Sequence, residues 1–453
     1  MENKLKEKYG LFTAIAMVVG IVIGSGVFFK AEKVLTATGG DLPLGILAWV
    51  LGGAIMIICA YTFSILATKY SGVNGIVDYA DATVGRWYAY MVGWFTTVIY
   101  FPAMTSVLAW VSARYTGVLL GWAPDSPQVM VLTFAFLIGS FALNTISPII
   151  AGKFQIATTV IKLVPLILMA IIGTVVGLCN GMTVENFTTV VETDLAGGKG
   201  GAIFAALVAS AFAYEGWIIA TSINAEIKNS KKNLPIALVV GSIIVAAVYI
   251  LYYIGLSGVV SNAELMKGGE KGARIAFEKL FGSVGGIGLF VLVIISCLGT
   301  LNGLMLGVSR CMYAIAARDN GPRPEMMSQV DKHTNMPVNS AVIGLLTSML
   351  WMVFFYGANL TEKCWFGVIS FDSSELPIIT IYAMYIPVFF MMMVKEKNLN
   401  PFKRFVMPIV SIGCCIFMVG AAISAHGMGV VWYLCVFVVI MLLALPFYKR
   451  KKK

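Results

Sequence analysis

Two apolar stretches of the chain contain residues that could bind a small charged molecule inside a membrane. The first includes Gly24-Ser25-Gly26, and the second, about 190 residues later, includes Glu215 and Gly216. Hydrocarbon offers no partner for a free N–H or C=O group, so irregular backbone is tolerated there only beside protein or a cavity. Two matching breaks of this kind indicate a ligand site between them.

The first break has the composition of an anion-binding turn. The turn formed by Gly24, Ser25, Gly26 and Val27 lies at the start of the next helix. Its free amide groups could hold a carboxylate. The positive end of the helix dipole would face that anion. A second interpretation is helix packing, because Gly20 and Gly24 also have the GxxxG spacing.

The second break carries an acidic residue in an apolar span. Placing Glu215 there costs at least ~2.5 kcal/mol on insertion scales, which favours a functional role. Gly216 gives the backbone freedom to unwind. The carbonyl groups released around Phe212, Ala213, Tyr214 and Glu215 would suit an ammonium group. One break therefore offers donors and the other acceptors, which together match the zwitterion of an α-amino acid.

Lys162 is a third buried charge. It lies roughly 13 Å into the span that begins near Phe154. Extending its side chain to the headgroups would require it to climb several helical turns. It shares one helical face with three polar residues, Gln155, Thr158 and Thr159. A later span presents a polar face that could meet it, formed by Ser296, Thr300 and Gly303. The Lys162 ammonium could replace a sodium ion or could lose its proton during a cycle.

The elements that position these residues are membrane helices. The chain has 453 residues, of which 59% are hydrophobic and 12% charged, with a mean hydropathy of +0.88. These values predict an all-α polytopic membrane protein. Each span needs ~20 residues. Twelve spans are predicted, with starts near Leu11, Leu44, Trp87, Val129, Phe154, Ala202, Leu234, Gly285, Val338, Phe366, Val406 and Val430.

The spans predict one transmembrane domain over residues 1–453. Two sets of five spans each open with a broken helix, one at about 11–180 and the other at about 202–396, and helices 11 and 12 follow at about 404–447. Because five is odd, the second set enters the membrane from the opposite side, so the two breaks meet near the midplane. No soluble catalytic domain, nucleophile–base pair or metal cluster is evident, so we do not expect an enzyme.

The charges predict a topology. On the assumption that the N-terminus is cytoplasmic, 21 of the 32 basic residues fall inside and 9 outside, while Lys162 and Arg310 lie within spans. This asymmetry places both termini in the cytoplasm. The basic tail from Lys449 to Lys453 is expected to contact anionic lipid. The net charge of +10 is thus explained without nucleic acid. The eight cysteines include no CxxC pair and there are only two histidines, so no metal or cofactor is expected.

The quoted residues resemble a known family. Gly24-Ser25-Gly26-Val27-Phe28 and the stretch from Phe212 to Trp217 are similar to the paired signatures of the L-amino-acid transporter branch of the amino acid–polyamine–organocation superfamily, and the chain resembles its bacterial serine/threonine exchanger type. The similarity runs along the chain and includes the segments from Thr159 to Pro165 and from Leu301 to Gly303.

The resemblance implies a LeuT-like fold with a 5+5 inverted repeat, in which helices 1 and 6 are broken. It implies carboxylate binding at Ser25, Gly26 and Val27. It implies amine binding at four carbonyl groups, those of Ile23, Phe212, Ala213 and Glu215. Phe212 would be the occluding gate, and transport would be sodium-independent exchange.

Two features depart from the family pattern. Glu215 stands where relatives have Asp or Gly, so the pocket beside it can differ in size or charge. The loop from Gly121 to Pro127 lacks the cysteine by which animal members bind a heavy subunit. We therefore expect no disulfide-linked partner.

The leading functional hypothesis is exchange of neutral L-amino acids across the cell membrane by alternating access, with small ones such as alanine, serine and threonine favoured. Proton-coupled amino acid uptake with Lys162 as carrier is one alternative. Antiport of cationic amino acids or polyamines, with Glu215 holding the distal charge, is another. A sensor or a channel is a different class, and the short loops argue against a sensor.

Overall fold

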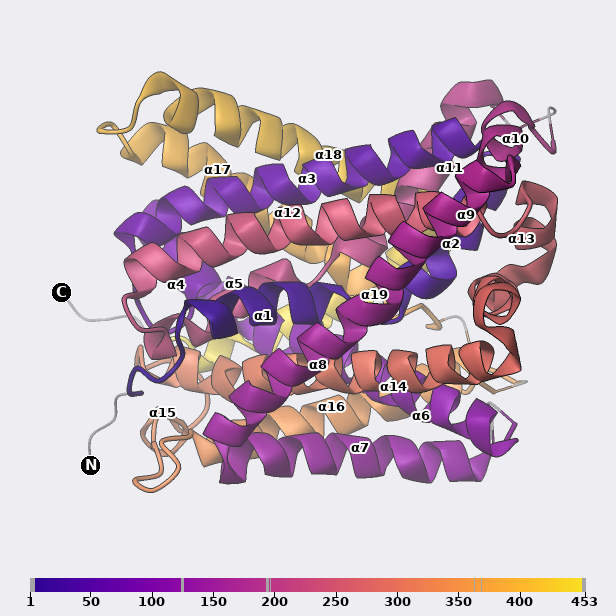
Figure 1. The fold of residues 1–453 in the computed structure, drawn as a ribbon. Coiled ribbons are helices and arrows are strands. Elements are labelled where there is room, and N and C mark those ends of the chain that lie inside the picture. The colour runs from indigo at the N-terminus through magenta and orange to yellow at the C-terminus, as the bar shows by residue number, and fades with distance from the viewer. Residues whose placement is uncertain are drawn as a thin grey trace.

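The structure is a computed structural model and describes residues 5–123, 126–192, 195, 197–361, 363–367 and 369–449. The described chain is helical apart from one isolated parallel bridge between Tyr9 and Ile227. Long helices run side by side along one axis, and α8 (Pro148–Leu168) crosses them obliquely (Figure 1). This arrangement confirms the predicted all-α polytopic architecture.

Ten helical stretches of the described chain are long and apolar enough to cross a membrane. They are α3 (Leu42–Lys69), Arg86–Leu120 (which contains α5, Arg86–Phe95, and α6, Phe101–Leu120), α7 (Pro127–Ile146), Pro148–Cys179 (which contains α8 and α9, Thr174–Cys179), α12 (Ser230–Ser257), α14 (Gly272–Ala316), α16 (Val338–Asn359), α17 (Leu376–Lys395), Phe402–His426 (which contains α18, Met407–His426) and Met428–Phe447 (which contains α19, Met428–Leu442). Shorter helices join them, namely α4 (Gly75–Thr83), α10 (Met182–Thr188), α13 (Asn262–Gly268) and α15 (Pro324–Met327).

The first and sixth predicted spans are divided into pieces too short for this count. The first consists of α1 (Leu11–Val22) and α2 (Gly26–Ala37). The sixth consists of α11 (Gly198–Ala211), a short turn of helix at Phe212–Tyr214 and a tighter helix, η4, over Trp217–Glu226. The two breaks are where the glycines predicted them. The total of twelve membrane helices stays a prediction, as does the division into two repeats.

One predicted helix start is wrong. The tenth span was expected near Phe366, but α17 begins at Leu376. The preceding residues are held in a turn, because Asp372 accepts hydrogen bonds from the backbone and hydroxyl of Ser374. The eighth span was expected near Gly285 and is helical from Gly272, with a sharp bend at Gly282 (φ 71°).

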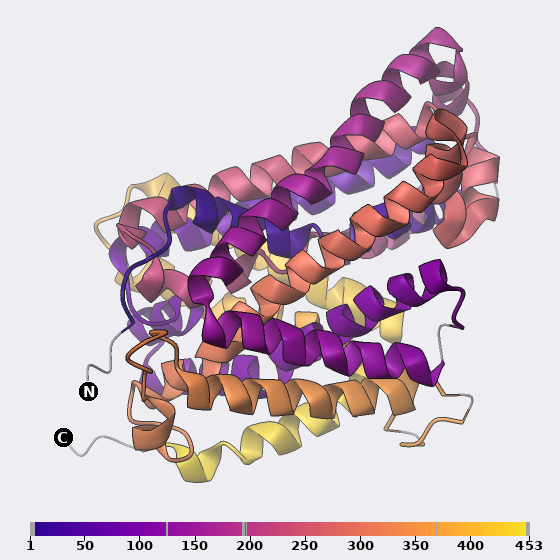
Figure 2. The same cartoon turned by 60° about the horizontal axis from the view of Figure 1, so that its bottom comes forward.

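The helices pack in groups around the two breaks. One group contains α6, α7 and α16, and a second contains α3, α11 and α12. Both α1 and α14 lie between the groups, because α14 contacts α6 and α8 while α1 contacts α12 and α14 (Figure 2). The first broken helix is thereby surrounded by protein rather than lipid.

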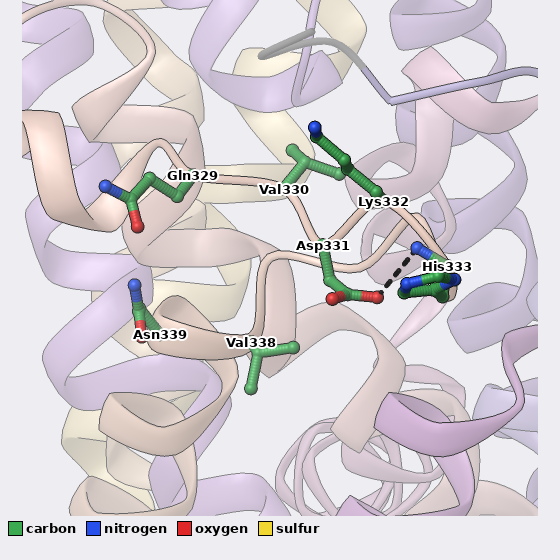
Figure 3. Close-up of a pocket in the computed structure, with 7 residues that line it drawn as sticks. All are labelled: Gln329, Val330, Asp331, Lys332, His333, Val338 and Asn339. Carbon is green, nitrogen blue, oxygen red and sulfur yellow. Dashed lines mark hydrogen bonds between the residues drawn. The ribbon is translucent and has the colours of Figure 1, made fainter. Parts of the chain in front are cut away.

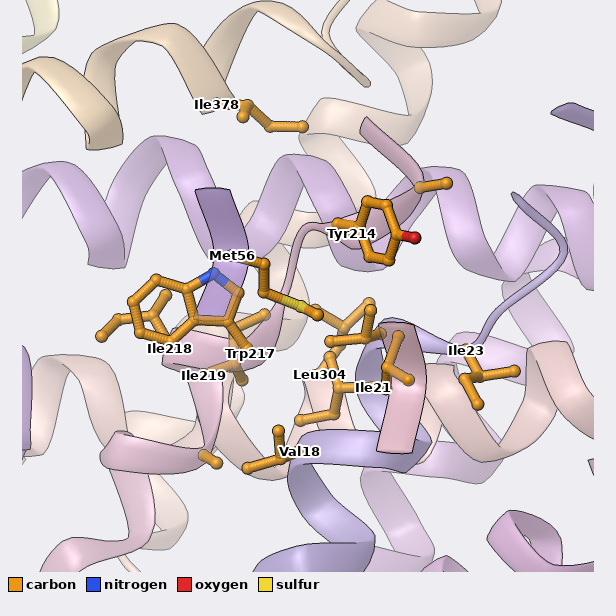
Figure 4. Packing of buried hydrophobic residues seen from close by; sticks show 14 of the residues in the cluster. Val18, Ile21, Ile23, Met56, Tyr214, Trp217, Ile218, Ile219, Leu304 and Ile378 are labelled. Carbon is orange, nitrogen blue, oxygen red and sulfur yellow. The ribbon is translucent and has the colours of Figure 1, made fainter. Parts of the chain in front are cut away.

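Aromatic side chains hold the breaks in place. Trp49 of α3 makes edge-on contacts with Tyr214 and Tyr249, with ring centroids 5.6 and 5.5 Å apart. Tyr214 donates a hydrogen bond to the Trp49 carbonyl at 2.9 Å. Such aromatic pairs contribute about 0.5–1.5 kcal/mol each beyond the area they bury. Figure 4 shows Tyr214 and Trp217 packed with apolar residues of the first break.

Tyr249 also satisfies the unwound backbone. Its hydroxyl lies 3.0 Å from the carbonyl oxygen of Val22 and 3.2 Å from that of Ala213. One carbonyl belongs to each break. A single side chain of α12 therefore bridges the two irregular segments, which is one way that non-helical backbone becomes tolerable at membrane depth.

Candidate functional site

A cavity of about 140 Å³ lies where the two breaks meet. This volume is well below the ~300–1,000 Å³ of pockets for drug-sized ligands, so the cavity suits a small molecule. Four elements line it, the first break, α6, the second break and α14. The lining residues are Ile21, Val22, Gly24, Ser25, Gly26, Met104, Leu108, Ala213, Glu215, Gly216, Ile219, Thr300 and Leu304.

The glycines allow the two breaks to touch. A Cβ atom on Gly26 would lie 3.5 Å from Ala213, and one on Gly216 would lie 2.9 Å from the Ile21 side chain. Gly216 also has φ +105°, a conformation that strains any residue with a side chain. The close approach therefore depends on the missing Cβ atom at Gly216, whereas the 3.5 Å at Gly26 is an ordinary van der Waals distance.

The start of α2 presents backbone donors to the cavity. Ser25 precedes the helix in a helical conformation and makes no side-chain cap. The first amide groups of an uncapped helix have no partner within the helix. Because Ser25 and Gly26 line the cavity, an anion placed there would meet these amide groups and the positive end of the dipole.

Lys162 is fully buried beside this turn and is completely hydrogen-bonded. Its ammonium group donates to the carbonyl oxygens of Gly20 (2.7 Å), Ile23 (2.6 Å) and Ser296 (3.0 Å). The Thr300 hydroxyl oxygen lies 3.2 Å away. The side chain reaches from α8 to the end of α1 and to α14. A cation thus occupies a site made of carbonyl and hydroxyl oxygens, the ligands that a hard metal cation prefers.

Glu215, unlike Lys162, lines the cavity. Its side chain is buried, and one carboxylate oxygen accepts a hydrogen bond from the Tyr100 hydroxyl. The other oxygen, Oε2, makes no hydrogen bond of good geometry among the described residues, although the Gly216 amide and the Tyr382 hydroxyl also act on this carboxylate. A buried polar atom without a partner is rare in a native structure and calls for an explanation.

The predicted site residues fall into three groups. Six of the predicted break residues line the cavity, together with Thr300. The six are Gly24, Ser25, Gly26, Ala213, Glu215 and Gly216. Lys162 and Ser296 lie behind it, and the Ile23 carbonyl, expected to accept a substrate amine, accepts a hydrogen bond from Lys162. Val27 and Tyr214 are buried outside the lining. The Phe212 side chain, the expected gate, lies outside the described residues.

Several lining residues were not predicted. Met104 and Leu108 of α6 are four positions apart, which places them on one helical face. Leu304 follows Thr300 by the same interval on α14. Nothing in these apolar types separates a cavity face from a lipid face, although the four-residue spacing from Thr300 was a usable signal for Leu304.

The end of the bundle that lies near both termini is closed by charge. Arg310 of α14 and Glu226 are both fully buried and form a bidentate ion pair. The Lys8 ammonium lies 2.6 Å from the same carboxylate. Tyr9 pairs with the residues after Glu226 through backbone hydrogen bonds, including one from Lys228 to the Tyr9 carbonyl at 2.8 Å. We call these four residues, Lys8, Tyr9, Glu226 and Arg310, the inner closure.

A second hollow lies in the loop between α14 and α16 (Figure 3). Its lining includes Asp331, His333 and Asn339. The Asp331 carboxylate accepts hydrogen bonds from the backbone of His333 (3.0 Å) and Thr334 (2.7 Å). Because its own loop occupies this carboxylate, the hollow does not present a free acid. No group of three metal-ligating side chains occurs among the residues that the structure describes.

Comparison with known proteins agrees with this geometry. A sequence profile for amino acid permeases matches residues 9–445. The chain belongs to the amino acid permease family. The serine/threonine exchanger SteT of Bacillus subtilis (strain 168) is 30% identical over 461 residues, covering 100% of this chain and 98% of that protein.

More distant permeases include proteins from animals. The human cystine/glutamate transporter is 26% identical and covers 78% of this chain and 68% of its own length. The rat large neutral amino acids transporter small subunit 2 is 25% identical, with coverages of 94% and 81%. The crystal structure of MhsT in complex with L-phenylalanine superposes with a TM-score of 0.55 at 16% identity, covering 92% of this permease and 99% of MhsT. This likeness confirms the predicted LeuT-like fold.

Proposed function

We propose that this permease exchanges small neutral L-amino acids across the cell membrane without sodium. The observation that carries the proposal is the fully bonded ammonium of Lys162 beside a cavity made by two helix breaks. A resident cation among oxygens leaves no room there for a sodium ion. The similarity to an exchanger supports the exchange mode.

In this proposal the substrate is held as a zwitterion. Its carboxylate binds the amide groups at Ser25, Gly26 and Val27, and its amine binds carbonyl groups of the second break, at Phe212, Ala213 and Glu215. The Ile23 carbonyl, already bonded to Lys162, keeps the first break in shape instead. The cavity of about 140 Å³ supports a preference for small side chains such as those of alanine, serine and threonine. Phe212 remains the proposed gate.

Lys162, Ser296 and Thr300 have a coupling role in the proposed cycle. Opening toward the cytoplasm requires α1 to move away from α8 and α14, which breaks the bonds of Lys162 to Gly20 and Ile23. Substrate bound at the adjacent turn favours the arrangement in which these bonds are intact. Substrate and the Lys162 bridge are therefore linked through one short segment of backbone.

We propose that both termini are cytoplasmic. The two ends of the described chain contact the same loop, since Lys8 approaches the Asn335 carbonyl and the Gly321 amide donates to Phe447. The excess of basic residues near this face supports a cytoplasmic location. No disulfide-linked heavy subunit is proposed, because the loop from Gly121 to Pro127 lacks cysteine; Pro124 and Asp125 lie outside the described residues. Lipid contact of the basic tail stays a prediction, since residues 450–453 also lie outside them.

The unpaired oxygen of Glu215 favours a second candidate, antiport of cationic amino acids or polyamines. A cationic side chain in the cavity would supply the missing partner. In the third candidate, proton-coupled uptake, Lys162 carries the proton.

Uptake of a labelled amino acid panel into proteoliposomes separates these candidates. We expect uptake of alanine, serine and threonine that requires internal amino acid and is unchanged when sodium is replaced by choline. Robust uptake into empty vesicles would contradict exchange, and a steep sodium requirement would contradict the role of Lys162. Strong competition by arginine would favour the second candidate, and substrate-driven acidification of the vesicle interior the third.

A further inference from the structure

A three-residue charge cluster lies at the opposite end of the molecule from the inner closure. Glu375 stands at the start of α17, between Lys30 of α2 and His426 at the end of α18. The Lys30 ammonium lies 3.0 Å from Glu375 Oε1, and His426 Nε2 lies 3.1 Å from Glu375 Oε2. Each carboxylate oxygen thus has its own basic partner. We call Lys30, Glu375 and His426 the outer cluster.

The outer cluster acts on the half-helix that forms the anion site. Lys30 follows Gly26 by four residues, which is about one helical turn. Any movement of Lys30 along or around the axis is therefore transmitted to the amide groups at the start of α2. Glu375 belongs to α17, which packs against α18, so it anchors α2 to a different part of the bundle.

The protonation states of the cluster can be assigned. Burial raises the pKa of Glu375, but His426 and Lys30 outweigh this effect and bring the pKa to about 2. Glu375 is consequently ionised throughout the physiological range. The charged groups that act on His426 are Glu375, Asp372 and Lys30. Asp372 is already engaged by Ser374. The group whose charge changes near neutral pH is therefore His426.

We propose that Glu375 is a positioning residue for the carboxylate-binding half-helix α2, and that protonation of His426 from the outer side strengthens its hold. This inference rests on the proposed amino acid transport. An imidazolium makes a second charge-assisted contact with the carboxylate and fixes it for Lys30. A neutral imidazole can make only an uncharged hydrogen bond to Glu375, so the carboxylate is held less firmly, α2 moves more freely and the anion site is less well formed.

The direction of the pH effect follows. As external pH rises through the titration of His426, the Michaelis constant for external substrate should increase, while the maximal exchange rate changes little. The side chains of the cluster are 16–23% exposed, so the pair is partly screened. The expected change is roughly two- to fivefold, the size associated with partly exposed ion pairs.

The test is exchange in oriented proteoliposomes at fixed internal pH, with external pH varied from about 5 to 8, the range in which histidine titrates. In His426→Gln the Michaelis constant should no longer depend on external pH. In Glu375→Gln it should be raised at every external pH, whereas Lys30→Arg, which keeps the cation, should behave like the parent. Glu278→Gln is the matched control, because Glu278 pairs with Arg274 on α14 and touches neither partner of the cluster.

The outcomes separate this inference from the proposed function. A parent protein that exchanges amino acids with a Michaelis constant independent of external pH would overturn the inference and leave the proposed function intact. The same holds if His426→Gln keeps the pH profile of the parent, or if the dependence follows internal pH. A parent that binds and moves no amino acid would instead overturn the proposed function.

Discussion

Lys162 and Glu215 carry opposite charges into the same bundle, but their surroundings differ. Every donor of the Lys162 ammonium is used by an oxygen of α1 or α14, and the side chain does not line the cavity. Glu215 lines the cavity and leaves one oxygen without a hydrogen bond of good geometry among the described residues. A fully bonded buried charge holds its neighbours in one arrangement, whereas a partly bonded one is poised to accept a ligand. The comparison supports the proposed coupling role for Lys162 and a proposed recognition role for Glu215.

The largest effect on substrate binding should come from filling the cavity that Glu215 lines and Lys162 lies behind. In Gly26→Leu the new side chain starts 3.5 Å from Ala213 and extends into the cavity. We expect substrate binding to be lost while the protein still inserts, as measured by scintillation proximity binding and by size-exclusion chromatography in detergent. Gly413→Leu is the control, since a Cβ atom there meets nothing. Binding equal to the parent would reduce the Gly24 to Gly26 segment to a packing motif.

Lys162→Ala tests the coupling half of the comparison. Removing the ammonium takes the donor away from three buried carbonyl groups, and a buried acceptor left without its donor costs about 1–3 kcal/mol, which corresponds to roughly five- to a hundredfold if expressed in the transport equilibrium. Alanine preserves the helix, so the fold should persist. We expect exchange to fall at least tenfold, and affinity to shift differently on the two faces of oriented proteoliposomes.

The same variant distinguishes coupling from proton transfer when affinity is measured at two pH values. A proton carrier predicts loss of pH-dependent flux with nearly normal binding. Lys153→Ala is the control, because Lys153 is exposed on the same helix. Unchanged transport in Lys162→Ala would contradict both the coupling role and the proton-carrier role of Lys162.

Glu215→Gln tests the recognition half. Glutamine keeps an acceptor for the Tyr100 hydroxyl and removes the unpaired charge. We expect exchange of neutral amino acids to stay within about threefold of the parent, the scale of ~0.6 kcal/mol. Any inhibition by arginine or polyamines should disappear. A collapse of neutral exchange would mean that the charge, rather than the backbone carbonyls, binds the substrate amine.

The smallest effect is expected on the pH dependence of stability. It comes from Asp78, an acid outside the membrane whose pKa is set mainly by burial. Burial raises the pKa of Asp78 to about 6 despite its ion pair with Arg318. The unfolded value is about 3.9, so the native state binds the proton more tightly. The contribution of Asp78 to stability is fully present below about pH 4 and is lost as pH rises through about 6. Melting curves of Asp78→Asn should lack this pH dependence, and a slope identical to that of the parent would contradict the assignment.

The sequence predicts those parts of the site that have unusual chemistry. Gly24, Gly26 and Gly216 mark the breaks because helices in lipid seldom unwind without them. Lys162 and the Ser296–Thr300 face were placed together by helical spacing, and the structure brings them within hydrogen-bond distance. A charge in hydrocarbon has few alternatives, so its surroundings are strongly constrained.

The rest of the site could not be predicted, because an apolar residue type does not indicate whether the side chain faces a cavity or lipid. Met104 and Leu108 line the cavity, yet their types are equally suited to a lipid-facing surface. The use of the Ile23 carbonyl by Lys162 depends on the distance between α1 and α8, which no local pattern encodes. The start of α17 was misplaced because the apolar residues around Phe366 precede a turn at Asp372 rather than a helix.

The inner closure has a consequence for the energy of the working cycle. A seal of apolar side chains would expose those side chains to water whenever this end of the bundle opened, at a cost that grows with their area. Arg310 and Glu226 lose their mutual attraction on opening, but each regains hydration, and for a buried ion pair these two terms are of similar size. A charged seal can thus exclude water completely while closed and still open at little net cost on every turnover.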